Sequence, residues 1–138
     1  MQPPRYGSRS LAEVLPSIAH ALGDRRFDNA LAFPDMEQAV LLVVDGLGWE
    51  QLQPHLEDLP QIGPAVREQR PIDAAFPTTT PAGLATLTLG MEPGRHGFVG
   101  ATFNLPEFET VLAPLHWERE PLPEAVQPEP TMFQRMHG

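Results

Sequence analysis

The sequence predicts an α/β fold with a mostly parallel sheet and helices on both faces. Residues 39–44 are an uncharged run of Ala, Val and Leu with the length of a strand. A strand that is apolar on both faces is typical of the centre of a parallel sheet. Segments with helical spacing occur before and after it, at residues 11–22 and 82–89. This alternation of helix and strand is typical of α/β layering.

The first predicted helix has clear start and stop signals. Ser10 and Glu13 have the spacing of a capping box, in which each side chain accepts a hydrogen bond from the other residue's backbone N–H. Apolar residues follow at helical spacing to Leu22, and Gly23 ends the pattern. Pro16 lies inside this segment, so we expect it to kink or delay the helix.

The middle of the chain is predicted as strand, helix, helix and strand. Residues 39–44 are the clearest strand, and residues 49–56 are weakly helical. Residues 59–68 predict a second helix that Pro64 interrupts. Residues 72–76 predict a short strand.

The best predicted helix covers residues 82–89. Thr80 suits its N-cap, Pro81 its first position and Gly90 its C-terminal stop. Residues 98–105 alternate loosely and predict a strand.

The C-terminal part is rich in proline. The chain contains 17 prolines, and residues 105–130 are predicted to be largely irregular. Thr131 and Gln134 resemble a second capping box, which opens a helix. Because that helix reaches Gly138 after about two turns, we expect an incomplete structure with an exposed apolar flank.

Composition excludes several classes of protein. The net charge of −9 opposes binding to nucleic acids or to anionic membranes. The longest apolar run, at residues 39–44, is too short to span a bilayer. The chain has no cysteine, so a metal would need carboxylate, imidazole or hydroxyl ligands. We expect a soluble, cytoplasmic protein, and no sequence feature indicates its oligomeric state.

Asp45 is a candidate metal ligand. It follows the predicted strand 39–44 directly, and ligands of open α/β sheets bind at the carboxyl ends of strands. Gly46 and Gly48 allow the backbone to approach whatever the carboxylate holds. The alternative is a turn aspartate that caps the next helix.

Thr80 is a candidate nucleophile. At a helix N-terminus, unpaired N–H groups and the helix dipole favour anions, so its hydroxyl is well placed to attack phosphorus. A threonine needs a base or a metal for this role. The alternative is a threonine that only caps the helix, and Thr78 and Thr79 are rivals by position. His96 is interpreted as fixing a turn, with substrate or metal binding as the alternative.

Two segments together resemble one protein family. Val43-Val-Asp-Gly-Leu-Gly48 resembles its first metal motif. Phe76-Pro-Thr-Thr-Thr-Pro81, followed by Leu89-Gly90, Pro93 and His96-Gly97, resembles its nucleophile segment. The family is that of the type I phosphodiesterases and nucleotide pyrophosphatases of the alkaline phosphatase superfamily. The resemblance is strongest over residues 39–100.

The resemblance implies a fold and a mechanism. Residues 1–138 would be a single, incomplete N-terminal portion of an alkaline-phosphatase-like catalytic domain. Two divalent metal ions, most often Zn²⁺, would serve a small phosphate-ester substrate. Asp45 and Thr80 would bind one metal, and Thr80 would form a phosphothreonine intermediate.

The sequence departs from the family pattern in two ways. The family's phosphoryl-binding asparagine corresponds in register to Ala101, and Asn104 nearby is the substitute candidate for substrate binding. The remaining aspartate and histidine ligands of the family come later in its chains than residue 138. The second metal site would therefore be incomplete, and we expect this chain alone to be inactive.

Two other classes of function stay open. The chain would be a non-catalytic binding domain if it kept the fold and lost the site. It would be a generic α/β domain if Asp45 and Thr80 are structural. Within the superfamily, sulfatase-like or phosphonate-cleaving activity is a further alternative.

Overall fold

A computed structural model describes residues 2–118 and 120–137. Met1, Arg119 and Gly138 lie outside the described residues. The first and last residues of the predicted 1–138 portion are therefore not described. The chain divides into two compact units. The first comprises Met1–Ala39 and Asp73–Gly138, and the second comprises Val40–Ile72.

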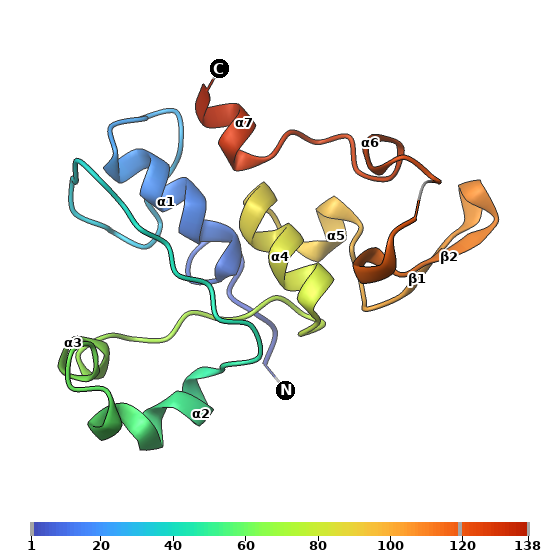
Figure 1. Cartoon of the computed structure of the whole chain (residues 1–138). Coiled ribbons are helices and arrows are strands. Elements are labelled where there is room, and N and C mark those ends of the chain that lie inside the picture. Colours follow the sequence, from blue (N-terminus) through green and yellow to red (C-terminus); the bar gives the residue numbers. More distant parts are fainter. Residues whose placement is uncertain (1, 119, 138) are drawn as a thin grey trace. The chain divides into compact units, whose positions relative to one another are not determined.

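The first unit is mainly helical (Figure 1). Its α-helices are α1 (Val14–Ala21), α4 (Thr80–Leu89), α5 (Pro93–His96), α6 (Pro123–Val126) and α7 (Met132–His137). Its 3₁₀ segments are η1 (Leu11–Glu13), η3 (Pro106–Phe108) and η4 (Pro114–His116). Its two strands are β1 (Phe103–Leu105) and β2 (Thr110–Leu112).

Both predicted capping boxes are confirmed. The Glu13 carboxylate accepts from the Ser10 backbone N–H at 2.6 Å, and Ser10 caps η1 in return. At the other end of the chain, Gln134 Oε1 accepts from the Thr131 N–H at 2.7 Å, which opens α7. As predicted for a helix containing Pro16, the α-helix is delayed and begins only at Val14, after the 3₁₀ turn.

Helix α4 lies at the centre of the first unit. It packs against η1, α1, α5 and α7, and Figure 1 shows α1 and α5 beside it. Gly90 ends the helix in the left-handed conformation, as predicted. The Arg135 guanidinium on α7 donates to the Leu89 carbonyl, which satisfies a C-terminal carbonyl of α4. Buried apolar residues around it include Ala12, Leu15, Ala82, Leu87, Leu89 and Met132.

The sheet in the described part of the chain is smaller than predicted. Strands β1 and β2 form an antiparallel pair in which Asn104 lies opposite Val111. The predicted strand 98–105 therefore shortens to its last three residues. The predicted strand 72–76 is wrong: Asp73 makes an isolated parallel bridge with Ser10 and no ladder.

The second unit is a small helical arrangement. It contains α2 (Trp49–Leu52), η2 (Gln53–Asp58) and α3 (Gly63–Arg67). The predicted helix 59–68 is thus limited to α3, whose first turn accommodates Pro64. Gly63 packs so tightly that a Cβ there would lie 2.1 Å from the Leu56 carbonyl oxygen.

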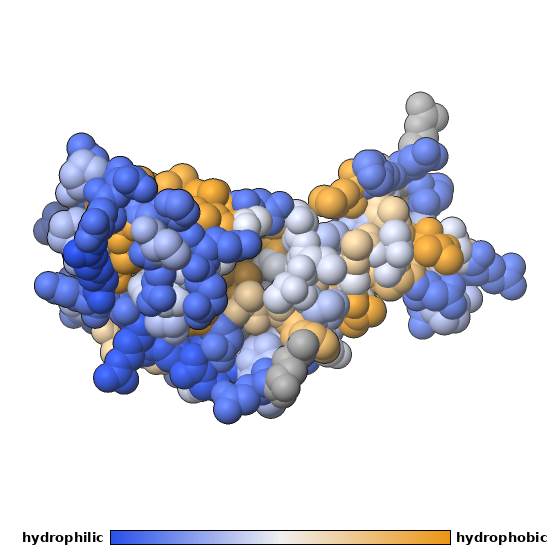
Figure 2. Space-filling view, turned by 90° about the horizontal axis from the view of Figure 1, so that it is seen from below, coloured by the Kyte–Doolittle hydropathy of each residue, from blue (hydrophilic) through white to orange (hydrophobic). Residues whose placement is uncertain are grey.

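The predicted strand 39–44 is wrong in this structure. Its residues form no strand, and their side chains are exposed, with Val40 at 97% and Leu42 at 80% of full exposure. A strand is stabilised by backbone hydrogen bonds to neighbours, and none of the described residues supplies a neighbouring strand here. Exposed apolar residues also appear as orange areas on the molecular surface (Figure 2).

The mostly parallel sandwich with helices on both faces is therefore not confirmed. The described residues contain helices and a single two-stranded antiparallel sheet. The described part also lacks any helix with the length and apolar character needed to cross a membrane.

Candidate functional site

Asp45 lies in an exposed turn of the second unit. Gly46 continues the turn with φ of +72°, a left-handed conformation that glycine adopts without strain. The next helix, α2, has Gly48 as its N-cap, and the Gly48 N–H donates to Gln51 Oε1 at 2.6 Å. Asp45 lies three residues before this N-cap.

Thr80 is the first residue of α4, and the predicted N-cap position is wrong by one residue. Thr79 is the N-cap: its extended backbone leads into the helix, and its hydroxyl oxygen accepts from the Ala82 N–H at 3.4 Å. Pro81 then takes the second helical position, which also lacks an intrahelical acceptor for an N–H. The hydroxyl that caps α4 is therefore that of Thr79.

The loop before α4 is tied to the N-terminal segment. The Phe76 N–H donates to the Tyr6 hydroxyl oxygen at 3.0 Å. Arg5 donates to both carboxylate oxygens of Asp73, at 2.7 and 2.8 Å. These hydrogen bonds from Arg5 lower the pKa of Asp73 to about 2, so the carboxylate stays ionised across the physiological range. The residues that lead to Thr80 are thereby anchored at two points.

His96 fixes a turn, as interpreted from the sequence. It is 3% exposed and ends α5, and Gly97 follows with φ of +80°. The Phe98 N–H donates to His96 Nδ1 at 3.1 Å, so Nδ1 is unprotonated and Nε2 carries the proton. Nε2 then donates to Thr86 Oγ1, 3.0 Å away on α4. With both ring nitrogens occupied inside the protein, His96 has a structural role here.

We expect this arrangement to make stability depend on pH. Burial lowers the pKa of His96 below its ordinary value of about 6.5, against smaller opposing effects of a hydrogen bond to its own backbone and of the Glu92 carboxylate. At a pH between the two pKa values, His96 is therefore protonated in the unfolded state and neutral in the folded state. The contribution of neutral His96 to the free energy of unfolding is complete above about pH 6.5. It declines as the pH falls through 6.5 towards the lower pKa of the folded state.

The measurement is the urea midpoint at pH 7.5 and 5.5 for the parent and for His96→Gln. The parent should lose more stability between the two values, because the variant has no ring to protonate. The other histidines are common to both proteins and cancel in the difference. Equal losses in the two proteins would contradict the assignment.

Comparison with known protein families matches residues 39–137 to the family described as "Type I phosphodiesterase / nucleotide pyrophosphatase". The matched region contains both Asp45 and Thr80. The chain belongs to this family. Comparisons with curated proteins and with solved structures gave no match.

Membership in the type I phosphodiesterase / nucleotide pyrophosphatase family suggests a hydrolase that acts on phosphodiester or pyrophosphate bonds. It also implies an alkaline-phosphatase-like α/β fold, of which the described residues supply helices and one antiparallel pair. The predicted family resemblance is thus confirmed over a longer segment than residues 39–100.

The third predicted site residue, Asn104, lies in β1. Its side chain is exposed, and its strand partner across the ladder is Val111. Asp45 belongs to the second unit, whereas Thr80 and Asn104 belong to the first, so each is described within its own unit. The cap at Thr79 was missed because three successive threonines offer equivalent hydroxyls in the sequence.

The described residues do not by themselves fit the metal centre typical of this family. No group of three or more His, Asp or Glu side chains within residues 2–118 and 120–137 is arranged to hold a metal ion. A catalytic zinc ion takes three protein ligands, whereas Asp45 and Thr80 would supply two oxygen atoms. A complete centre would require ligands from elsewhere.

Proposed function

We propose that this chain is the nucleophile-bearing portion of a metal-dependent hydrolase of phosphodiester or phosphate-ester bonds. The observation that carries the proposal is the family match over residues 39–137, which includes the motifs of Asp45 and Thr80. One further observation supports it: Thr79 is the N-cap of α4, so Thr80 is the first residue of the helix and not its cap.

In this proposal Thr80 carries the covalent step. Its Oγ forms a bond to phosphorus as the bond from phosphorus to the leaving oxygen breaks, and water then hydrolyses the phosphothreonine. The positive N-terminal end of the dipole of α4, a helix of ten residues, would favour the negatively charged phosphoryl oxygens. Asn104 is the proposed additional contact to substrate. When bound, divalent metal ions, Zn²⁺ by family resemblance, would stabilise the developing charge on oxygen.

The first test follows from the number of metal ligands, because Asp45 and Thr80 would supply two where a catalytic zinc ion takes three. We propose that residues 1–138 form one incomplete portion of the catalytic domain, with the remaining metal ligands encoded downstream. A nitrophenyl phosphodiester should be hydrolysed by the protein extended with its natural downstream sequence in the presence of Zn²⁺. The 138-residue chain should show no turnover above background with or without Zn²⁺. Rapid zinc-dependent turnover by the short chain would refute the ligand count.

We expect Asp45→Asn to weaken metal activation of the extended protein. A neutral amide is a poorer ligand than a carboxylate for a divalent cation, so the zinc concentration for half-maximal activity should rise about tenfold or more. The measurement is activity against free Zn²⁺ in a metal buffer. Asp58→Asn is the matched control, because Asp58 is an exposed carboxylate of the same unit whose described contact is a surface pair with His55. Equal zinc dependence in the two variants would contradict the role of Asp45.

A non-catalytic binding domain is the second candidate. The observation that favours it is the lack, among the described residues, of three clustered metal-ligating side chains. It predicts no turnover by the extended protein at any zinc concentration, so the same assay separates the two functions.

A further inference from the structure

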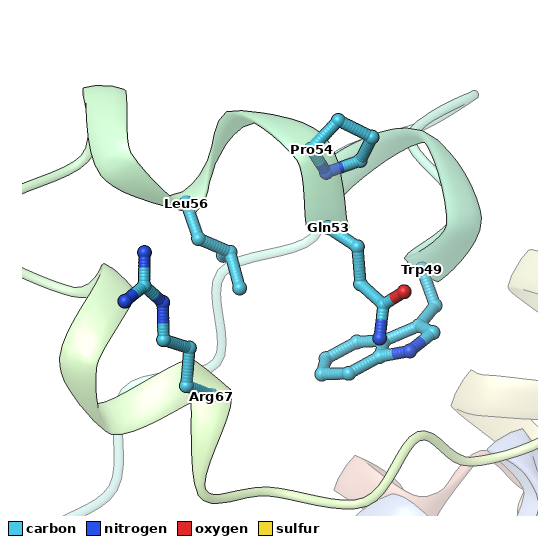
Figure 3. Close-up of a pocket in the computed structure, with 5 residues that line it drawn as sticks. All are labelled: Trp49, Gln53, Pro54, Leu56 and Arg67. Atoms are coloured by element: carbon cyan, nitrogen blue, oxygen red, sulfur yellow. The ribbon is translucent and has the colours of Figure 1, made fainter.

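The second unit contains a pocket that the proposed hydrolase function does not use. It has a volume of about 420 Å³ and is lined by Trp49, Gln53, Pro54, Leu56 and Arg67 (Figure 3). All of these residues belong to α2, η2 and α3, so the pocket lies within one compact unit. Its volume is within the range of roughly 300–1,000 Å³ that small-molecule sites occupy.

The close approach of α3 to η2 forms this pocket. Gly63 begins α3 against the Leu56 carbonyl, and only a glycine permits that distance. Leu56 is 6% exposed and forms the apolar wall between the two helical segments. Figure 3 shows Trp49 and Arg67 on opposite sides of this wall.

One side of the pocket suits a flat apolar ring. The Trp49 indole is only partly buried, and Pro54 and Leu56 line the same pocket. Aromatic rings stack on an indole in offset or edge-to-face geometry and gain more than their buried area alone provides. Gln53 lies next to Trp49 in Figure 3 and offers an amide donor and acceptor to a substituent on such a ring.

The opposite side suits an anion. The Arg67 guanidinium is exposed, and its partner is the exposed Glu57 carboxylate at 3.4 Å, beyond the usual length of a charge-assisted hydrogen bond. An exposed pair of this kind contributes little, so a bound anion can replace Glu57.

The charge of the second unit selects against simple anions. Val40–Ile72 contains two arginines and five acidic residues, which gives a net charge of −3. A small anion without a ring would gain one contact to Arg67 and be repelled by the surrounding carboxylates. An anionic ligand therefore needs a second contact, such as an aromatic ring against Trp49, in addition to its contact with Arg67.

We propose that this pocket binds planar aromatic carboxylates, with the ring against Trp49 and the carboxylate on Arg67. The proposal is independent of the hydrolase function, because none of the lining residues is a proposed catalytic residue or metal ligand. An exposed pocket of this size should give a Kd of about 1 mM for a two-ring compound.

The test is an NMR titration of the ¹⁵N-labelled 138-residue chain with 2-naphthoate. Saturable shifts are expected at the Trp49 indole N–H and the Gln53 side-chain amide. 2-Naphthol lacks the carboxylate and acetate lacks the ring, so both should bind at least about tenfold more weakly. Binding of acetate as tight as that of 2-naphthoate, or shifts confined to residues outside the pocket, would overturn the proposal.

Variants identify the two halves of the site. Arg67→Gln should weaken 2-naphthoate about tenfold by removing a charge-assisted hydrogen bond. Glu57→Gln should strengthen binding severalfold by removing the competing carboxylate. Arg25→Gln is the control, because Arg25 forms a comparable surface pair with Asp35 in the first unit. Trp49→Ala should abolish detectable binding, and Trp49→Phe should retain part of it.

Equal affinities for the parent, Arg67→Gln and Glu57→Gln would overturn the assignment of the anion to Arg67. Both substitutions are at exposed positions, so both variants should keep the NMR spectrum of the folded protein. The comparison of their affinities therefore tests the anion site even if the Trp49 variants fail to fold.

Discussion

Thr80→Ala should abolish turnover of a nitrophenyl phosphodiester by the extended, zinc-loaded protein. If Thr80 forms the covalent intermediate, the loss in kcat should be at least about a thousandfold, as for other removed nucleophiles. Because Thr79 caps α4, Thr80→Ala should leave the cap of the helix in place, and the melting temperature of the variant is measured beside its activity. Loss of activity without loss of stability would distinguish chemistry from folding.

The neighbouring threonines supply the controls. Thr79→Ala should cost about 1 kcal/mol of stability through the lost cap, while activity below the melting temperature is retained. Thr78→Ala should change neither quantity substantially, because Thr78 is exposed and precedes the cap. Full activity in Thr80→Ala would remove the nucleophile assignment and most of the proposed mechanism.

Gly63→Ala should destabilise the second unit by about 1–3 kcal/mol, the usual cost of overpacking. The new Cβ would lie 2.1 Å from the Leu56 carbonyl oxygen, which belongs to the backbone and cannot rotate away. Thermal unfolding followed by Trp49 fluorescence in a Trp117→Phe background reports on this unit, because Trp49 is then the remaining tryptophan.

Gly94→Ala is the control for the glycine-to-alanine change itself, and because Gly94 lies in the first unit, its melting temperature is followed by circular dichroism. Gly94 is also within a short helix, and a Cβ there meets no atom within 4 Å. It should be neutral or stabilising by up to about 1 kcal/mol, the helix preference of alanine over glycine. Equal melting temperatures for the two variants would show that α3 can move away from Leu56 at little cost.

Local signals were predicted well from the sequence. The capping boxes at Ser10 and Thr131 and the stop at Gly90 depend on residues within one turn of each other, so their spacing is sufficient evidence. The helix at residues 82–89 follows from the same kind of information.

Long-range features were not predicted. A strand at residues 39–44 requires hydrogen-bonding neighbours, and an apolar run cannot specify whether they are present. The choice between Thr79 and Thr80 as the cap depends on backbone angles that three identical residues do not encode. The pocket at Trp49 and Arg67 was also missed, because it depends on how closely α3 approaches η2.

The exposed segment 40–44 has a consequence for how the protein behaves at high concentration. Five uncharged, largely β-branched residues without proline are the kind of sequence that stacks into intermolecular cross-β structure. The net charge of −9 opposes such stacking by repulsion between molecules. Salt at 0.1 M screens charges beyond about 10 Å, so added salt should remove this protection and lower the colloidal stability of the solution.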